Sequence, residues 1–293
     1  MDISIAGMFG NSPRRDLGFV RDFAQGLEGL GFRSLVVPEH VVFFAAYESS
    51  YPYSDDGEPT FDPEAGLYDP LFVCQAAADV TERLRFMTGV LILPQRPALL
   101  TAREVVTLDH LSGGRFELGV GSGWSWEEYA ALGVPFEGRG GRFDEYIEAI
   151  KVAWRDDRAT YRGDFVEFEN AVMNPKPLNP GGPPIIIGGD SAVAMRRAAR
   201  IGDGWYGWWA QPDIEAHLAQ LHQAMADHDR SVTDDDFAFK LGVPLSRIAP
   251  EEIAAKVDRA RDLGVQELVL AGPIPARTFE ESLTDIAEAA GLS

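Results

Sequence analysis

The sequence predicts an α/β protein that folds as a single (β/α)8 TIM barrel over residues 1–293. Eight short β-rich runs alternate with longer helical patterns along the chain, and this alternation is typical of parallel strands joined by right-handed crossovers. A length of 293 residues accommodates one such barrel. Eight strand–helix units at this length favour a closed barrel over an open doubly wound sheet.

The first half of the chain is predicted to supply four strands, each a short apolar run that leads to a helical pattern. The expected strands cover residues 3–8, 33–37, 84–91 and 115–120, and the expected helices cover residues 16–29, 69–80, 98–111, 127–131 and 141–156. Gly31 and the Ser-Gly-Gly sequence after residue 111 supply helix stops. Residues 40–67 show no periodicity and are predicted to form a long loop after the second strand, either a lid or a dimer contact.

The second half of the chain is predicted to supply the other four strands. The expected strands cover residues 185–187, 204–207, 237–242 and 267–271, and the expected helices cover residues 192–201, 213–227, 250–263 and 279–289. Residues 160–184, which precede them, contain a short alternating stretch and a Pro-rich connection. Functional residues of such barrels lie at the carboxyl ends of the strands and in the loops that follow, so these positions are where a site is expected.

The charge of the chain argues against several classes of partner. There are 26 Lys and Arg residues against 46 Asp and Glu residues, a formal net charge of −20, and such a surface repels nucleic-acid phosphates and anionic membranes. We therefore expect a small-molecule substrate, no nucleic acid and no membrane. The N-terminus does not resemble a secretion signal, and no apolar stretch approaches the length of a membrane helix, so a cytoplasmic protein is expected.

Cysteine and histidine usage indicates no metal site. Cys74 is the only cysteine, which excludes an intramolecular disulfide and a cysteine-ligated metal cluster. Its apolar neighbours predict an inert thiol in the core. No pair of histidines stands beside a carboxylate at a strand end, so no metal is predicted.

Two titratable residues, Glu39 and His40, directly follow the second expected strand, which directs them to the mouth of the barrel. Imidazole titrates near neutral pH, and His40 with Glu39 beside it is a candidate proton donor or acceptor. The alternative is a histidine that bonds a loop carbonyl, and position alone favours neither.

Two glycine-containing strand ends predict a close approach of a ligand to the backbone. The candidates are Gly89 and Val90 in the third strand, and Gly119, Gly121, Ser122 and Gly123 at the end of the fourth. Glycine inside a strand marks a bulge or a close contact, although barrel packing or a tight turn explains these residues equally well. The GVGSGW sequence lacks the third glycine of a dinucleotide motif, which indicates dinucleotide binding only weakly.

The fifth strand ends in Gly188 and Gly189, and Asp190 and Ser191 then cap the next helix. Free N–H groups at a helix start, made accessible by glycines, form an anion site. These four residues are predicted to bind a phosphate, and the alternative is a helix cap without a ligand.

Aromatic residues gather in the loops after the second, fourth and sixth strands. The residues expected to line a substrate pocket are Phe43, Trp124, Trp126, Trp205 and Trp208. Aromatic side chains usually belong to the core, but their concentration at strand ends indicates an apolar pocket for a planar or apolar ligand.

These features together resemble the bacterial luciferase-like superfamily of flavin and deazaflavin oxidoreductases. The resemblance covers nearly the whole chain, and its most specific stretch runs from "LPQRPALLTAREVVTLDHLSGGRFELGVGSGW" to "GRGGRFDEYIEAI". It is joined by "LEGLGFRSLVVPEH" and by "NPKPLNPGGPPIIIGGDSAVAMRRAARIGDGW".

The resemblance implies a luciferase-like barrel, a homodimer and, in the relatives that match best, coenzyme F420. It implies that Gly89-Val90 forms a bulge, often with a non-prolyl cis peptide, that backs the cofactor ring. The acid or histidine of the family falls on Glu39 and His40. The cofactor phosphate of the family falls on Gly188–Ser191, and its glycine-rich turn on Gly119–Gly123. Arg14, Arg15 and Arg277 are placed to meet an anionic cofactor tail.

Two departures from the relatives that oxidise glucose 6-phosphate change the expected substrate. Trp124 stands where those relatives carry a proton-donating Glu, and "GWWAQ" replaces the stretch that holds a phosphate-binding Lys. We therefore predict hydride transfer between F420 and a small apolar or aromatic substrate, with His40 exchanging the proton. The alternatives are an FMN-dependent monooxygenase and a non-catalytic flavin- or deazaflavin-binding relative. The short segment 237–250 favours the deazaflavin branch.

Overall fold

A computed structural model describes residues 1–9, 17–54, 56–59, 61–209 and 213–292, and within them eight parallel strands close into a barrel. The strands pair in the order β1-β2-β3-β5-β8-β9-β10-β11 and return to β1. Their bounds are β1 (Asp2–Ala6), β2 (Ser34–Val37), β3 (Arg85–Thr88), β5 (Phe116–Gly121), β8 (Ile185–Gly188), β9 (Gly204–Trp208), β10 (Ala238–Pro244) and β11 (Glu267–Ala271). The predicted fold class is confirmed.

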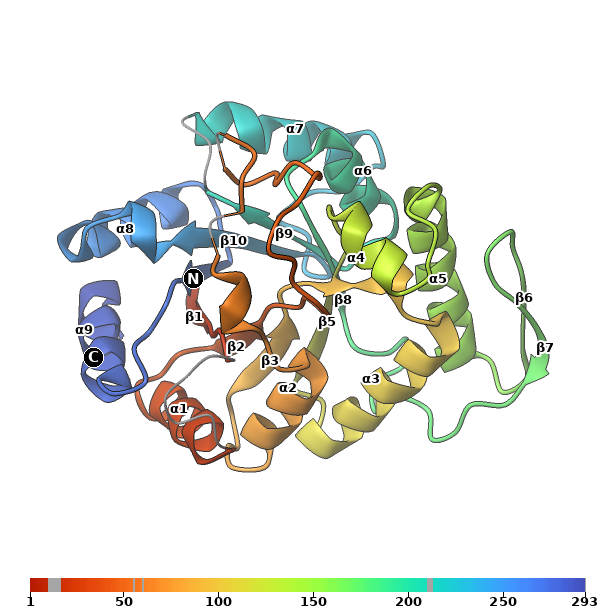
Figure 1. Ribbon diagram of the computed structural model, residues 1–293, viewed down its shortest axis with the longest axis horizontal. Coiled ribbons are helices and arrows are strands. Elements are labelled where there is room, and N and C mark those ends of the chain that lie inside the picture. Colours follow the sequence, from red (N-terminus) through yellow and green to blue (C-terminus); the bar gives the residue numbers. More distant parts are fainter. Residues whose placement is uncertain (10–16, 55, 60, 210–212, 293) are drawn as a thin grey trace.

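Helices surround the barrel, as Figure 1 shows. Their bounds are α1 (Leu17–Gly29), α2 (Pro70–Ala78), α3 (Ala98–Ser112), α4 (Trp126–Ala131), α5 (Arg139–Arg155), α6 (Ala192–Ile201), α7 (Ile214–Ala226), α8 (Ile253–Asp262) and α9 (Phe279–Ala290). Short 3₁₀ helices are η1 (Pro63–Ala65), η2 (Leu93–Gln95), η3 (Leu245–Arg247) and η4 (Pro250–Glu252). The predicted alternation of strands and helices is confirmed, because local periodicity sets it.

The predicted third strand, 84–91, is interrupted. The Gly89–Val90 peptide bond is cis, so β3 ends at Thr88 and the chain resumes as β4 (Leu91–Ile92), which pairs with β5. The bulge that the resemblance implied here is therefore present, and it lies at the carboxyl end of the barrel.

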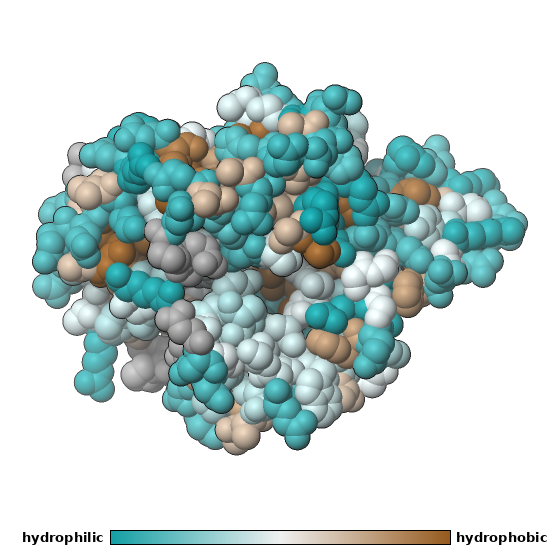
Figure 2. All heavy atoms as spheres, turned by 90° about the horizontal axis from the view of Figure 1, so that it is seen from above, coloured by the Kyte–Doolittle hydropathy of each residue, from teal (hydrophilic) through white to brown (hydrophobic). Residues whose placement is uncertain are grey.

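Residues 159–171 form a hairpin that leaves the body of the molecule. Strands β6 (Ala159–Arg162) and β7 (Glu167–Ala171) pair antiparallel, and the hairpin projects beyond α5 in Figure 1. It accounts for the alternating stretch seen in the sequence. The face drawn in Figure 2 is mostly hydrophilic, in line with the net charge of −20.

The core has two layers because side chains alternate along each strand. On β9, Trp205 faces the helices and joins the large outer cluster, whereas Tyr206 and Trp208 face the inside of the barrel. Cys74, in α2, is fully buried in the outer layer as predicted, and burial raises the pKa of its thiol. Among the described residues, no helix combines the length and the apolar character needed to cross a bilayer.

The interior near the amino ends of the strands is charged. Lys240 Nζ lies 2.5 Å from a carboxylate oxygen of Glu117 and 2.5 Å from one of Glu267. Ser4 Oγ donates to the other oxygen of Glu267 at 2.5 Å, and Arg85 contacts Glu117 at 3.0 Å. Every charge named here has a partner of opposite sign, which offsets the cost of burying it.

Candidate active site

The cis Gly89–Val90 segment sits in a cradle made by glycines of two neighbouring strands. A Cβ on Gly121 would lie 2.7 Å from Val90 Cγ2, and a Cβ on Gly188 would lie 2.6 Å from Val90 Cγ1. A Cβ on Gly119 would lie 1.9 Å from the Thr88 carbonyl oxygen. These glycines thus make room for the break in the third strand, in agreement with the barrel-packing alternative that the sequence left open.

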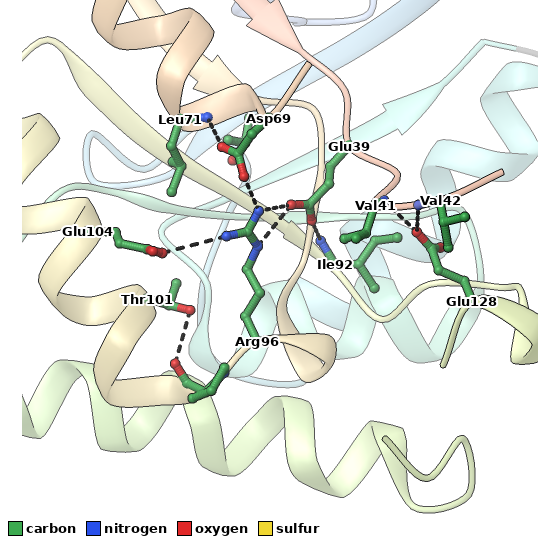
Figure 3. A network of polar contacts seen from close by, with 12 residues as sticks. Glu39, Val41, Val42, Asp69, Leu71, Ile92, Arg96, Thr101, Glu104 and Glu128 are labelled. Carbon is green, nitrogen blue, oxygen red and sulfur yellow. Dashed lines mark hydrogen bonds and ion pairs between the residues drawn. The ribbon is translucent and has the colours of Figure 1, made fainter. Parts of the chain in front are cut away.

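His40 lies at the mouth of the barrel and is held by a carboxylate that the sequence analysis did not single out. Its Nδ1 lies 3.0 Å from Glu128 Oε2. Figure 3 shows the other oxygen, Glu128 Oε1, which accepts the N–H of Val41 at 2.6 Å and contacts that of Val42 at 3.4 Å. Glu128 is 1% exposed. With Nδ1 directed at the carboxylate, Nε2 is the nitrogen that can exchange a proton at the mouth.

Aromatic side chains of the loop 40–67, together with Trp124 of the segment between β5 and α4, surround His40. The His40 ring centroid lies 5.2 Å from Phe43, 5.8 Å from Phe61 and 5.9 Å from Trp124. Tyr51 continues the row from Trp124, at 5.2 Å, to Tyr53, at 5.5 Å. The predicted pocket residues Phe43 and Trp124 are therefore brought together with His40.

The row of rings ends on the opposite side of the mouth. Tyr53 lies 6.3 Å from Trp208 of β9, whose ring lies 5.9 Å from Tyr206. The long loop thus crosses the mouth from the end of β2 to the end of β9, and the predicted pocket residue Trp208 lies under its far part.

Glu39 does not share the mouth with His40. It is 5% exposed, and its carboxylate accepts the Ile92 N–H at 2.6 Å and an Arg96 Nε–H at 2.9 Å. Arg96 also contacts Asp69 at 2.6 Å and Glu104 at 3.6 Å (Figure 3). Burial raises the pKa of Glu39, although the Arg96 charge opposes the rise. Both of its oxygens are engaged within the protein, and its catalytic role stays a prediction.

Helix α4 anchors the start of the loop through two adjacent acids. Beside Glu128, Glu127 accepts the N–H groups of Glu48 and Ser49 at 2.6 and 2.9 Å and the Ser49 hydroxyl at 2.7 Å. Ser125 begins the helix as its N-cap and also donates to Glu127 at 2.8 Å. Burial opposes ionisation of Glu127, but these hydrogen bonds outweigh it and lower its pKa to about 2.

The predicted phosphate turn forms at the start of α6, and its acid is already engaged. Ser191 is the N-cap, and its hydroxyl accepts the Ala194 N–H at 3.2 Å. Asp190 Oδ1 accepts the Trp208 N–H at 2.9 Å and lies 3.2 Å from His217 Nε2. Asp190 therefore joins β8, β9 and α7, and phosphate binding by the backbone N–H groups of this turn stays a prediction.

Two of the predicted pocket tryptophans lie elsewhere. Trp205 is fully buried on the helix side of the barrel, where its Nε1 donates to the Gly189 carbonyl at 2.9 Å and its ring packs against Phe239. Trp126 is 41% exposed and lines an open hollow of about 500 Å³ beside α4. Neither belongs to the row of rings around His40.

Three arginine residues are predicted to meet an anionic cofactor tail. Arg14 and Arg15 lie outside the described residues, and Arg277 is exposed in the segment between β11 and α9.

Two residues of the site, Glu128 and Tyr206, were not predicted from the sequence. Strand alternation was a signal for Tyr206, because Trp205 and Trp208 are an odd number of positions apart and cannot both face the mouth. Glu128 follows a helix cap, but no local pattern relates it to His40, 88 positions away.

Comparisons with known proteins identify the family of the chain and several of its relatives. The family model described as luciferase-like monooxygenase matches residues 4–266. An uncharacterised protein of Mycobacterium bovis is 36% identical over 198 residues, which cover 68% of each chain. The FMNH2-dependent dimethylsulfone monooxygenase of Pseudomonas putida is 35% identical over 204 residues, 65% of this chain and 54% of that enzyme.

A solved structure shares the fold over the whole chain. The coenzyme F420-dependent tetrahydromethanopterin reductase of Methanopyrus kandleri superposes with a TM-score of 0.70, at 16% identity, over 98% of this chain and 99% of that one.

Proposed function

The chain belongs to the luciferase-like monooxygenase family, and we propose that it is an F420-dependent oxidoreductase of a small apolar or aromatic substrate. The observation that carries the proposal is the connection of the cis Gly89–Val90 segment to the loop of His40. The Gly89 N–H donates to the Val37 carbonyl at 2.7 Å, and Glu39 accepts the Ile92 N–H on the far side of the break. A ring held against this segment would therefore lie beside the proton-exchanging histidine.

The residues at the mouth fit a flat ring with a polar edge. Glycines at the carboxyl ends of β5, β8 and β10 keep side chains away from the barrel axis, and aromatic side chains of the loop 40–67 cover the mouth. The fully buried Tyr206 hydroxyl has no partner among the described residues and can serve a polar ligand. Bound there, a deazaflavin would supply or accept the hydride.

Side chains of the protein would position the substrate and exchange the proton. Glu128 would orient His40 through its contact with Nδ1, while the rings of Phe43, Phe61 and Trp124 would bind an apolar substrate and exclude water. The loop 40–67 would act as a lid, because its aromatic residues span the mouth and must part to admit a ligand.

An FMN-dependent monooxygenase is the second candidate, favoured by the 35% identity to the FMNH2-dependent enzyme of Pseudomonas putida. The short connection from β10 to α8, residues 245–252, supports the deazaflavin alternative, because the resemblance relates a longer insertion there to flavin monooxygenases.

Parallel titrations with F420 and FMN, followed by tryptophan fluorescence, test the proposal. We expect micromolar or tighter binding of F420 with little binding of FMN, and hydride transfer in a screen of apolar ketones, alcohols and aromatic compounds. The reverse preference, with substrate-dependent oxygen uptake, would establish the FMN monooxygenase instead. Binding of neither cofactor would contradict both candidates.

We also propose that the chain forms a homodimer through α2 and α3. These adjacent helices expose Phe72, Leu100 and Leu111, which are 78%, 52% and 57% exposed. Large exposed apolar side chains on neighbouring elements are typical of interaction surfaces. Light scattering should give twice the chain mass of 32.1 kDa, and Phe72→Glu should shift it to the monomer; a monomeric wild-type protein would contradict the proposal.

A further inference from the structure

The side chain of Tyr206 carries a buried hydroxyl group inside the barrel. Tyr206 is 2% exposed, and its hydroxyl has no hydrogen-bond partner among the described residues. Buried hydroxyl groups in proteins almost always have one, because an unmet hydrogen bond lowers stability. Tyr129 follows the rule, since its buried hydroxyl donates to the Ser122 carbonyl at 2.7 Å.

Two glycines define the position of the Tyr206 side chain. A Cβ on Gly242 would lie 2.9 Å from the Tyr206 hydroxyl, so any larger residue there would crowd this oxygen. A Cβ on Gly89 would lie 3.6 Å from Tyr206 Cε1, which places the phenol ring against the cis Gly89–Val90 segment. The hydroxyl thus lies inside the barrel, next to the segment that would back a cofactor ring.

The surroundings keep the hydroxyl protonated and therefore a donor. Burial raises the pKa of Tyr206, and the nearby Tyr53, Asp190 and Glu267 raise it further. Tyr53, from the loop 40–67, lies 6.3 Å from Trp208 on the mouth side, so the loop covers the hydroxyl from solvent.

We propose that the Tyr206 hydroxyl is a cofactor-binding group that donates a hydrogen bond to the polar edge of a ring bound against Gly89–Val90. The inference rests on the proposed function. The ligand atom is a carbonyl oxygen or ring nitrogen of the pyrimidine portion, which F420 and FMN share. Tyr206 binds and orients the ring, whereas His40 exchanges the proton.

The substitution Tyr206→Phe tests this directly, because it removes one oxygen and preserves the ring packing. In the ligand-free protein it should leave the melting temperature unchanged or raise it, since no hydrogen bond is lost. Tyr129→Phe, the same change at a partnered hydroxyl, should lower the melting temperature by roughly 2–4 °C. The dissociation constant of the cofactor that wild type binds should rise about 10-fold in Tyr206→Phe.

The outcomes separate this inference from the proposed function. Equal cofactor binding by wild type and Tyr206→Phe would overturn the inference and leave the function standing. A fall in melting temperature like that of Tyr129→Phe would overturn it too, because the hydroxyl would then stabilise the fold. Failure of wild type to bind either F420 or FMN would overturn the proposed function, and this inference with it.

Discussion

The two ends of the barrel interior differ in whether their buried polar groups have partners. Near the amino ends of the strands, Lys240 is 3% exposed and bonded to two carboxylates, so the buried charges are matched. At the carboxyl ends, glycines replace large side chains, and the Tyr206 hydroxyl has no partner within the part of the chain that the structure describes. The first arrangement stabilises the fold, and the second leaves binding capacity for a ligand.

The difference shows where a buried polar group indicates function. In the cluster of Lys240, Glu117 and Glu267, each charged group is bound to one of opposite sign, and such a cluster indicates a structural role. A buried polar group that is incompletely paired beside a strand break leaves a donor or acceptor for a ligand. The comparison therefore predicts that substitutions at the amino end change stability, whereas substitutions at the mouth change binding and turnover.

The largest effect is expected from Lys240→Met, which leaves Glu117 and Glu267 buried without their shared cation. Breaking a buried ion pair in this way costs about 3–5 kcal/mol of unfolding free energy. Chemical denaturation measures this loss of unfolding free energy. Arg162→Met is the control, because Arg162 and Glu169 form an exposed ion pair on the hairpin. Such a pair contributes less than about 1 kcal/mol. Equal losses from both substitutions would contradict the view that the cluster stabilises the barrel.

His40→Ala should come next, and it should affect turnover rather than stability. Loss of a general acid or base lowers the rate by roughly 10²–10⁴-fold, while cofactor affinity should change less. Steady-state kinetics with the substrate found by the screen measure the effect. His222→Ala, on the exposed surface of α7, is the control. Full activity of His40→Ala would show that the proton moves elsewhere.

Glu128→Gln should have a smaller effect, because the amide keeps the size of the side chain but loses its charge. We expect turnover to fall on the order of 10-fold. Glu288→Gln, exposed on α9, is the control, and unaltered turnover in Glu128→Gln would remove Glu128 from the mechanism.

The smallest effect concerns the anchor of the loop at Glu127. Its pKa in the folded protein, about 2, lies below the ordinary value of 4.5, so its stabilising contribution is present above pH 4.5 and is lost as the pH falls towards 2. Tryptophan fluorescence should report loosening of the loop beside Trp124 and Trp126 over this interval. Glu127→Gln should lose this acid-dependent step, and an identical titration of the variant would contradict the anchoring role.

Much of the fold could be predicted because its signals are local. The helix over 192–201 begins after Ser191, whose hydroxyl caps it, and ends before Gly202, so both of its predicted bounds are confirmed. The break at Gly89-Val90 followed from the resemblance, not from periodicity, which gave one continuous strand over 84–91. The tryptophans at 205 and 208 were grouped by composition, and strand alternation separates them.

The sequence by itself determined the barrel, the order of its elements, the position of His40 at the mouth and the glycine-rich strand ends. These depend on residues close together in the chain, where periodicity and helix caps operate. Only the tertiary structure decided that Glu128 contacts His40, 88 positions away, and that Arg96 engages Glu39, 57 positions away. Such pairs form when the barrel closes and strand ends distant in sequence meet at one face, and no local pattern records that meeting.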